Sequence, residues 1–146
     1  MLKIIEPAST EEFSQYYELR WKILRAPWKQ PRGSERDSLD DDSTHLMLVN
    51  PARIAVGVGR LHFSNIGQAQ IRYMAVDVAV QRQGHGSYLL LALEARAREL
   101  GAIRTVLDAR ETSLGFYHKQ GYEAVGPGHT LYNSIAHVRM EKSLSP

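Results

Sequence analysis

Residues 81–100 read QRQGHGSYLLLALEARAREL, a glycine-rich turn that runs directly into an apolar segment. The glycines at 84 and 86 allow the backbone to turn tightly and to approach a ligand closely. Leucines and alanines then recur on one face from Tyr88 to Leu100, which predicts a helix, and Gly101 is the residue type that ends one. The first amides of such a helix lack partners within it and favour a phosphate or pyrophosphate. A tight turn that serves packing alone is the alternative.

Two common phosphate-binding motifs do not fit this turn. A P-loop requires a lysine immediately before Ser87, and that position holds Gly86. A dinucleotide fingerprint requires G-x-G-x-x-G within alternating strands and helices, whereas this turn continues into Tyr88 and Leu89 and follows three segments that suit antiparallel strands. The ligand is therefore expected to be another phosphate-bearing cofactor.

The hydrophobic pattern on either side of the turn predicts seven strands and three helices in the order β-α-loop-β-β-β-α-β-α-β-β. Strands are predicted over residues 2–6, 45–49, 52–63, 70–77, 104–109, 122–125 and 135–142, and helices over 10–24, 88–100 and 114–120. Ser9 followed by Glu12 forms a capping-box pattern at the first helix, which Pro27 ends. Residues 28–43 show no period, and long loops in compact domains often serve as lids or binding loops.

Length and composition narrow the protein class. The chain has 146 residues, 43% of them hydrophobic, which fits a single domain over residues 1–146. With no cysteine, disulfides, thiolate catalysis and cysteine-based zinc sites are excluded, and the six histidines lack metal-ligand spacing, so no metal is expected. We expect no membrane segment, because no apolar run approaches about 20 residues. A net charge of +2 gives no reason to expect nucleic acid. The N-terminus lacks a signal-peptide pattern, which predicts a cytoplasmic protein.

The turn and a second segment together resemble a known family. Gln81, Gly84 and Gly86 fit the (Q/R)xxGx(G/A) motif of the GCN5-related N-acetyltransferases, the GNAT superfamily, and residues 116–122 (FYHKQGY) are similar to its FYxKxGF segment. The order of elements is similar along nearly the whole chain. Residues 16–31 (YYELRWKILRAPWKQP) also resemble the small bacterial ElaA-like branch, a weaker match. The resemblance implies an α+β (α/β/α layered) fold, with a mixed, mostly antiparallel sheet of six to seven strands and a splayed central pair flanked by helices.

By this resemblance the protein transfers an acetyl group from acetyl-CoA to a primary amine of a small molecule or protein, in a ternary complex. The resemblance assigns the CoA pyrophosphate to the turn and pantetheine to the strand before it. The cofactor-binding residues implied are Met74, Ala75, Val76, Gln81, Arg82, Gln83, Gly84, His85, Gly86 and Ser87. The chain departs from the family pattern at Val78, where proline is frequent, and at residues 110–112, where asparagine is frequent. Arg110 or Thr112 is the candidate replacement for that asparagine contact.

The chemistry needs a proton donor for the thiolate and a proton acceptor for the amine. Tyr117 matches the family tyrosine that protonates the CoA sulfur, and its alternative role is a packed aromatic. The base is not identified: His62, His45 and Tyr73 are candidates, and relatives often use a chain of waters instead. Strand alternation is expected to place Arg72, Met74 and Val76 on one face of the sheet, with Tyr73 and Ala75 on the other.

Acidic residues gather in the long loop after the first helix. They are Glu35, Asp37, Asp40, Asp41 and Asp42. One hypothesis places residues 28–42 at the rim of the acceptor pocket, where these carboxylates attract a cationic amine. The alternative is a solvated turn whose charges serve solubility.

Two functions stay open at this point. One is the acetyltransferase, with acetyl-CoA and an amine acceptor as its partners and a homodimer left open. The other is a non-catalytic acyl-CoA-binding sensor, which needs the glycine turn but not an acid such as Tyr117.

Overall fold

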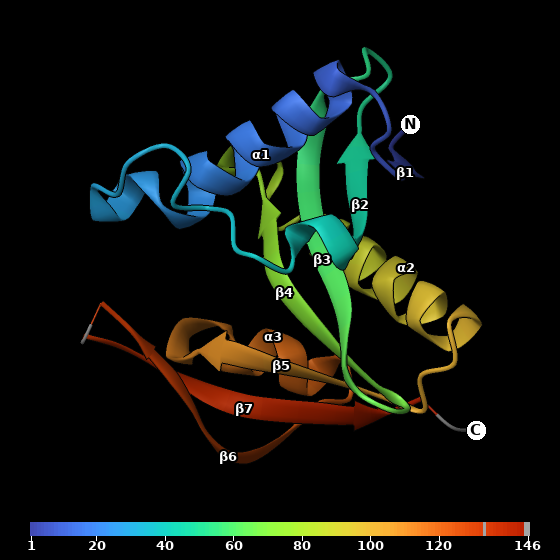
Figure 1. Ribbon diagram of the computed structural model, residues 1–146, viewed down its shortest axis with the longest axis vertical. Helices are drawn as coiled ribbons and strands as arrows, with labels where there is room; N and C mark the ends of the chain where they lie inside the picture. The colour runs from blue at the N-terminus through green and yellow to red at the C-terminus, as the bar shows by residue number, and fades with distance from the viewer. Residues whose placement is uncertain (133, 145–146) are drawn as a thin grey trace.

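The computed structural model describes residues 1–132 and 134–144, and these build a seven-stranded sheet with helices on both faces (Figure 1). The strands are β1 (Lys3–Ile5), β2 (Thr44–Val49), β3 (Ala55–Asn65), β4 (Gln68–Val76), β5 (Arg104–Arg110), β6 (Glu123–Leu131) and β7 (Ile135–Ser143). The α-helices are α1 (Thr10–Leu24), α2 (His85–Glu99) and α3 (Leu114–Lys119), with short 3-10 helices η1 (Ala26–Trp28), η2 (Asp40–Asp42), η3 (Val78–Val80) and η4 (Glu111–Ser113). The predicted element order and the α+β fold class are confirmed.

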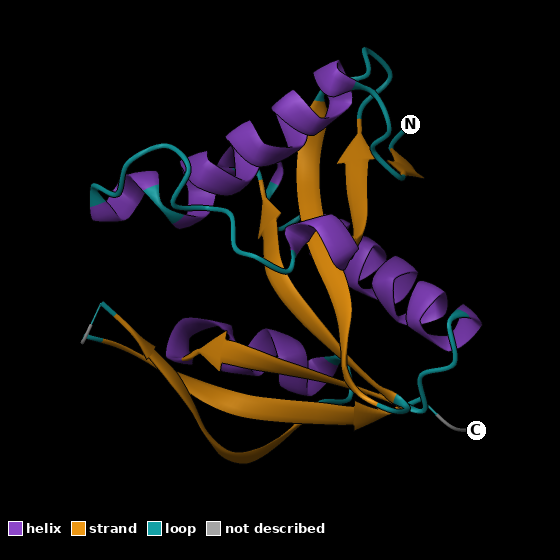
Figure 2. Ribbon diagram, viewed as in Figure 1, coloured by secondary structure: helices purple, strands orange, loops and turns teal. Residues whose placement is uncertain are grey.

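The strands lie in the order β1-β2-β3-β4-β5-β7-β6, and every described neighbouring pair is antiparallel except β4 with β5. Helix α1 covers one face, and α2 and α3 cover the other (Figure 2). The core on the α1 side includes Tyr16, Leu19, Met47, Val58 and Ala75. The core on the α2 side includes Leu61, Ile71, Leu89, Leu90, Leu93 and Leu107. Each fully buried leucine contributes about 2 kcal/mol.

Helix α1 begins where its sequence predicts. The Ser9 hydroxyl accepts a hydrogen bond from the Glu12 amide (3.0 Å), and the Glu12 carboxylate accepts one from the Ser9 amide (3.2 Å). Such a cap contributes about 1 kcal/mol to helix stability. The helix ends at Leu24, and Pro27 lies in η1 directly after it. Arg25 follows the last residue of α1 and lines the cavity described below.

Strand β4 contains a bulge that changes which side chains face α1. Val58 pairs with Ala75 and Arg60 pairs with Arg72, so two residues of β4 lie opposite one residue of β3. Tyr73, one of the two, has φ 54°, a conformation that costs a non-glycine residue about 1–3 kcal/mol.

The bulge reverses the alternation within β4. Ile71 belongs to the α2-side core and Ala75 to the α1-side core, although strict alternation would place both on one face. The prediction that Arg72 and Met74 share a face was therefore wrong. Arg72 reaches Asp37 in the loop after α1, whereas Met74 packs against the α2-side core.

Candidate active site

A cleft opens between β4 and β5, the parallel pair at the centre of the sheet. Their pairing covers only Gln68–Gln70 with Arg104–Val106. Beyond it the two strands diverge toward the end of the sheet near η1 (Figure 1). The facing edges of residues 71–76 and 107–110 have no strand partner in the part of the chain described. A cavity of about 340 Å³ lies here, lined by both strands and by side chains from both faces of the sheet.

Tyr117 of α3 lines this cavity from the α2 side. Its ring packs edge-on against Phe116 and Tyr122, at centroid distances of 5.0 and 5.8 Å. Its hydroxyl has no hydrogen-bond partner among the described residues. Burial raises the pKa of Tyr117 to about 12, so the phenol stays protonated at neutral pH. The side chain is an unengaged proton donor on the cavity wall.

The glycine turn lies between the end of β4 and the start of α2. Gly84 caps α2 with φ 82°, a left-handed conformation that glycine adopts without strain. Gly86 lies in the first turn, where an added Cβ would be 3.3 Å from Phe116 Cζ of α3. The amides of His85, Gly86 and Ser87 begin the helix and have no partner within it. Helix α2 thus presents three free donors beside the cleft.

Several of the sequence-predicted site residues line the cavity. They are Met74, Ala75, Val76, Gln81, Arg110, Thr112 and Tyr117. The remaining ones, Arg82, Gln83, Gly84, His85, Gly86 and Ser87, form the adjoining turn and the start of α2. The Gln81 side chain donates a hydrogen bond to the Val76 carbonyl (2.9 Å) and so fastens the turn to the end of β4.

Arginines and histidines from distant segments line the α1 side of the cavity. They are Arg25, Arg72, Arg110, His129 and His137, of which the sequence singled out only Arg110. Arg110 and His137 are register partners on β5 and β7. His137 is identified as a cavity residue by its position opposite Arg110 in the β5–β7 register. The sequence does not give this register, so His137 could not be predicted from it.

His137 has a defined proton arrangement. Its Nδ1 lies 3.0 Å from the Ile135 carbonyl and 3.2 Å from the His129 carbonyl. Because carbonyls only accept, Nδ1 carries the proton and Nε2 carries the lone pair. Burial lowers the pKa of His137, and the neighbouring His129, stacked at 4.2 Å, lowers it further. At neutral pH this imidazole is a neutral proton acceptor.

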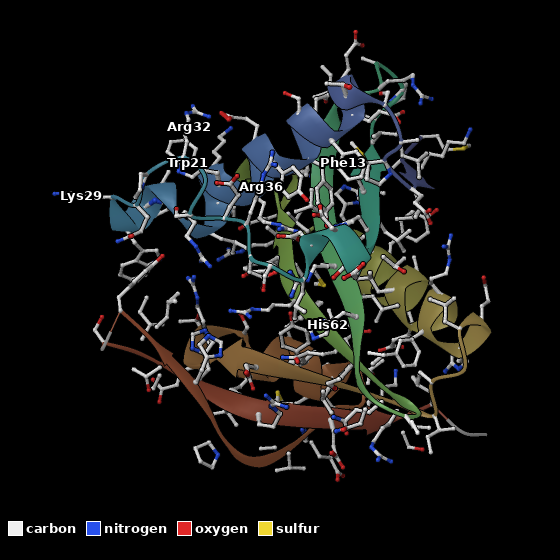
Figure 3. All side chains as sticks on the ribbon, viewed as in Figure 1. Phe13, Trp21, Lys29, Arg32, Arg36 and His62 are labelled. Carbon is white, nitrogen blue, oxygen red and sulfur yellow. The ribbon has the colours of Figure 1, made fainter. Side chains whose placement is uncertain are left out.

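The base candidates from the sequence are differently placed. Both ring nitrogens of His45 are engaged, by the Tyr16 hydroxyl (2.8 Å) and the Asp40 carbonyl (2.7 Å). His62 does not line the cavity. Figure 3 labels it on β3. Burial raises the pKa of Tyr73, whose hydroxyl donates to Asp37 (3.3 Å). Tyr73 lines the cavity, but its raised pKa keeps it a protonated phenol, which is a weak base at neutral pH.

Two acidic residues of the loop compensate buried arginines. Asp40 lies 2.9 Å from Arg20 and 3.2 Å from Arg60, and both arginines are fully buried. Asp37 pairs with Arg60 (2.5 Å) and Arg72 (3.6 Å). Asp41 and Asp42 are exposed, as a solvated turn predicts. None of the five acidic residues lines the cavity, and the placement of residues 28–42 at the rim of an acceptor pocket stays a prediction.

Residues 1–132 and 134–144 contain no group of three or more histidine, aspartate or glutamate side chains placed to hold a metal ion. No helix in this part of the chain has the length and apolar character needed to span a membrane.

Comparison with protein families matches residues 26–144 to the family described as "Acetyltransferase (GNAT) domain". Among curated proteins, the chain is similar to the uncharacterized N-acetyltransferase YjcF of Bacillus subtilis (strain 168). The two are 25% identical over 141 residues, which cover 97% of this chain and 99% of YjcF.

Solved structures share the fold. A candidate N-acetyltransferase from Lactobacillus plantarum superposes with a TM-score of 0.87 at 23% identity, covering 99% of both chains. Escherichia coli ElaA gives 0.80 at 17% identity, covering 98% of this chain and 99% of ElaA. A Bacillus subtilis acetyltransferase in complex with CoA gives 0.79 at 18% identity, covering 99% of this chain and 100% of that one. At these identities the likeness shows the fold alone, so membership of the ElaA-like branch stays a prediction.

Proposed function

The chain belongs to the GNAT acetyltransferase family, and we propose that it moves the acetyl group of acetyl-CoA onto a primary amine by direct attack in a ternary complex. One observation carries the proposal: the unpaired edge of β4 faces a cavity that holds a free tyrosine hydroxyl at one wall. A strand edge without a partner accepts an extended, amide-containing ligand as it would another strand. Pantetheine is such a ligand.

The residues around the cleft suit acetyl-CoA. The Asp77 amide donates to the Val56 carbonyl of β3 (2.8 Å), so strand alternation turns the backbone groups of Val76 and Met74 toward the cleft. The Val76 carbonyl is already engaged by Gln81, which leaves its amide and the groups of Met74 for pantetheine. The free amides of His85, Gly86 and Ser87 suit the pyrophosphate. A CoA complex of the same fold supports this assignment.

The cavity also supplies the proton transfers that aminolysis of a thioester requires. When bound, acetyl-CoA supplies an acyl group on a good leaving thiolate. As the new C–N bond forms and the C–S bond breaks, one proton leaves the amine and one reaches the sulfur. We assign the first to His137 Nε2 and the second to the Tyr117 hydroxyl, after which solvent exchange restores both groups. Tyr117 and His137 line the cavity from opposite faces of the sheet. This arrangement suits a reaction in which the amine and the thioester meet in the cleft, with the base beside the amine and the acid beside the sulfur.

A non-catalytic acyl-CoA sensor is the alternative. A sensor requires the turn and the β4 edge, but it gains nothing from an unengaged tyrosine hydroxyl and a neutral histidine in the same cavity. Those two side chains therefore favour the enzyme. The single domain over residues 1–146, the cytoplasmic location and the homodimer stay predictions of the sequence.

The test is a thiol-release assay with acetyl-CoA and a panel of primary amines. We expect amine-dependent release of free CoA; binding of acetyl-CoA without release by any amine would favour the sensor. Gly86→Asp tests the cofactor site. A carboxylate at a helix N-terminus does not destabilise the helix, but its negative charge repels the pyrophosphate of CoA. Gly86→Ala is the matched control, since it places the same Cβ against Phe116 without the charge.

We expect Gly86→Asp to weaken acetyl-CoA binding at least about tenfold relative to Gly86→Ala, at equal thermal stability. Equal affinities in calorimetry would contradict the assignment of the turn to the pyrophosphate.

A further inference from the structure

The α1-side wall of the cavity holds two arginines that no carboxylate compensates. Arg25 follows α1 and is only 7% exposed, and Arg110 ends β5. Both line the cavity, and neither has a carboxylate within 4.0 Å in the described chain. The buried Arg20 and Arg60, in contrast, each form an ion pair with Asp40. A buried charge without an ionic partner lowers the stability of the fold, and a bound anion would compensate it.

The two arginines lie close enough to repel each other. Burial lowers the pKa of Arg110, and the charge of Arg25 lowers it further. Arg25 is fixed in place by two hydrogen bonds, from Nε to the Ser34 carbonyl and from Nη1 to the Leu24 carbonyl, both 3.1 Å. Carbonyls satisfy its donors without neutralising its charge. An anion between the two guanidinium groups would relieve the repulsion and pair with both.

Aromatic rings hold both guanidinium groups across the mouth of the cleft. Arg110 lies over the Trp28 ring of η1 at 5.7 Å, and Arg25 lies over the Tyr132 ring beyond β6 at 6.0 Å. Each contact joins the segment after α1, which holds Arg25 and Trp28, to the segments of β5 and β6, which hold Arg110 and lead to Tyr132. The Arg110 side chain has no hydrogen-bond partner among the described residues, so its planar donors can bind a carboxylate bidentately, whereas Arg25 keeps Nη2 as the nitrogen that no carbonyl engages.

The position of these arginines assigns the anion to the acceptor rather than to CoA. Leu107 and Ala109 belong to the α2-side core, so alternation along β5 places Arg110 on the opposite face, where it meets Trp28. The glycine turn leads into α2, on the other face of the sheet. The CoA phosphates and the two arginines therefore lie on different faces of the sheet. Arg110 is thus assigned to the acceptor in place of the CoA contact that the family resemblance implied, and Thr112 stays the candidate for that contact.

We propose that the acceptor is a small primary amine that carries a carboxylate, and that Arg25 and Arg110 bind this carboxylate in the α1-side half of the cavity. The inference rests on the proposed acetyl transfer and names its substrate class. Because Arg110 pairs in register with His137, a carboxylate held there keeps the acceptor beside the proposed base. Amino acids are the simplest compounds of this kind, and a cavity of about 340 Å³ suits a molecule of that size.

The experiment compares amino acids with their own carboxamides and decarboxylated amines in the thiol-release assay. The carboxamide has the less basic amine and so more of the neutral nucleophile at pH 7.5, which favours it if the arginines play no part. We expect the reverse: one or more amino acids react at least about tenfold more efficiently than their own carboxamides. Equal or better turnover of the carboxamides throughout would overturn the proposal.

Variants locate the effect. Arg110→Gln should raise the KM of the carboxylated amine about tenfold or more, while the KM values for its decarboxylated analogue and for acetyl-CoA stay unchanged. Arg110→Lys, which keeps the charge, should restore part of the preference. Arg32→Gln is the matched control, because Arg32 also stacks on a tryptophan, Trp21, at 4.1 Å. That pair lies at the outer end of α1, and neither residue lines the cavity (Figure 3).

A binding measurement separates this proposal from the proposed function. Calorimetry of the same amino acids against protein saturated with CoA needs no turnover. Binding that Arg110→Gln removes would support the carboxylate site even if no acetyl transfer were found. Binding that Arg110→Gln leaves unchanged would overturn the site, whether or not the protein is an acetyltransferase.

Discussion

Tyr117 and Tyr122 offer a matched pair of hydroxyl deletions with opposite expected effects. Tyr117→Phe removes a hydroxyl that lines the cavity and has no partner among the described residues. Tyr122→Phe removes one that is fully buried, donates to Glu94 (2.8 Å) and lies 2.7 Å from the Thr105 hydroxyl. The first change should affect turnover and the second should affect stability.

The magnitudes follow from these contacts. A hydrogen bond to a charged group contributes about 1.5–3 kcal/mol, so losing the Tyr117 donor to a departing thiolate should lower kcat roughly tenfold to 150-fold. Because that hydroxyl bonds nothing in the protein, the free energy of unfolding should change by less than about 1 kcal/mol. Tyr122→Phe leaves buried partners unsatisfied at a cost of about 1–3 kcal/mol, or roughly 2–10 °C in Tm.

The assay measures kcat by thiol release with saturating acetyl-CoA and amine, and Tm by thermal unfolding. A pre-steady-state burst must be absent in the wild type, because slow CoA release would hide a change in the chemical step. The acetyl-CoA dissociation constant should be the same for wild type and Tyr117→Phe. A Tyr117→Phe protein with full kcat under these conditions would show that Tyr117 is a packing residue. Loss of stability with unchanged kcat would lead to the same conclusion.

Two further predictions use pH. His137→Gln should lower kcat/KM by about a hundredfold and remove the steeper acid-side decline below about pH 6.5, because a histidine with a lowered pKa accepts a proton only above that pKa; pH profiles that keep this decline would rule out His137 as the base. For Asp37, burial raises the pKa, but the hydrogen bonds from Arg60 and the Leu39 amide and the charges of Arg60 and Arg72 together outweigh it and lower the pKa to about 2. The carboxylate therefore stabilises the fold above its unfolded pKa by at most about 2 kcal/mol, reduced by partial exposure, and this is lost as the pH falls from about 4 through 2. Urea unfolding at stepped pH should show Asp37→Asn losing less stability than wild type over that range.

Signals between residues close together in the sequence were sufficient to predict the order of the helices and strands and the ends of α1 and α2. The Ser9–Glu12 pair fixes the start of α1 because a capping box depends on residues three apart, and glycines 84 and 101 flank α2 because their conformations depend on the adjacent backbone. The turn and Tyr117 were predicted through family motifs that are contiguous in the chain. These features need no knowledge of what packs against them.

The α1-side wall of the cavity was not predictable in this way. Arg25, His129 and His137 come from three separate segments, and only the sheet order and the β5–β7 register bring them to one cavity. The position of Arg72 depended on the bulge at Tyr73, because one extra residue in β4 changes the face of every side chain on one side of it. Alternation alone cannot locate such an insertion, since Tyr73 is not a residue type that signals a positive φ.

The charge of the cavity shows why a count of charges along the sequence misleads about the acceptor. The loop after α1 is rich in acidic residues, but Asp37 and Asp40 form ion pairs with Arg20, Arg60 and Arg72, which the fold places beside them. The buried Arg20 and Arg60 require these carboxylates, because an ion without a partner inside the protein is unstable. Arg25 and Arg110 form no ion pair with these carboxylates, and both line the cavity. The acceptor therefore meets a positive wall, and a cationic amine without a carboxylate would be repelled by the same residues that bind an amino acid.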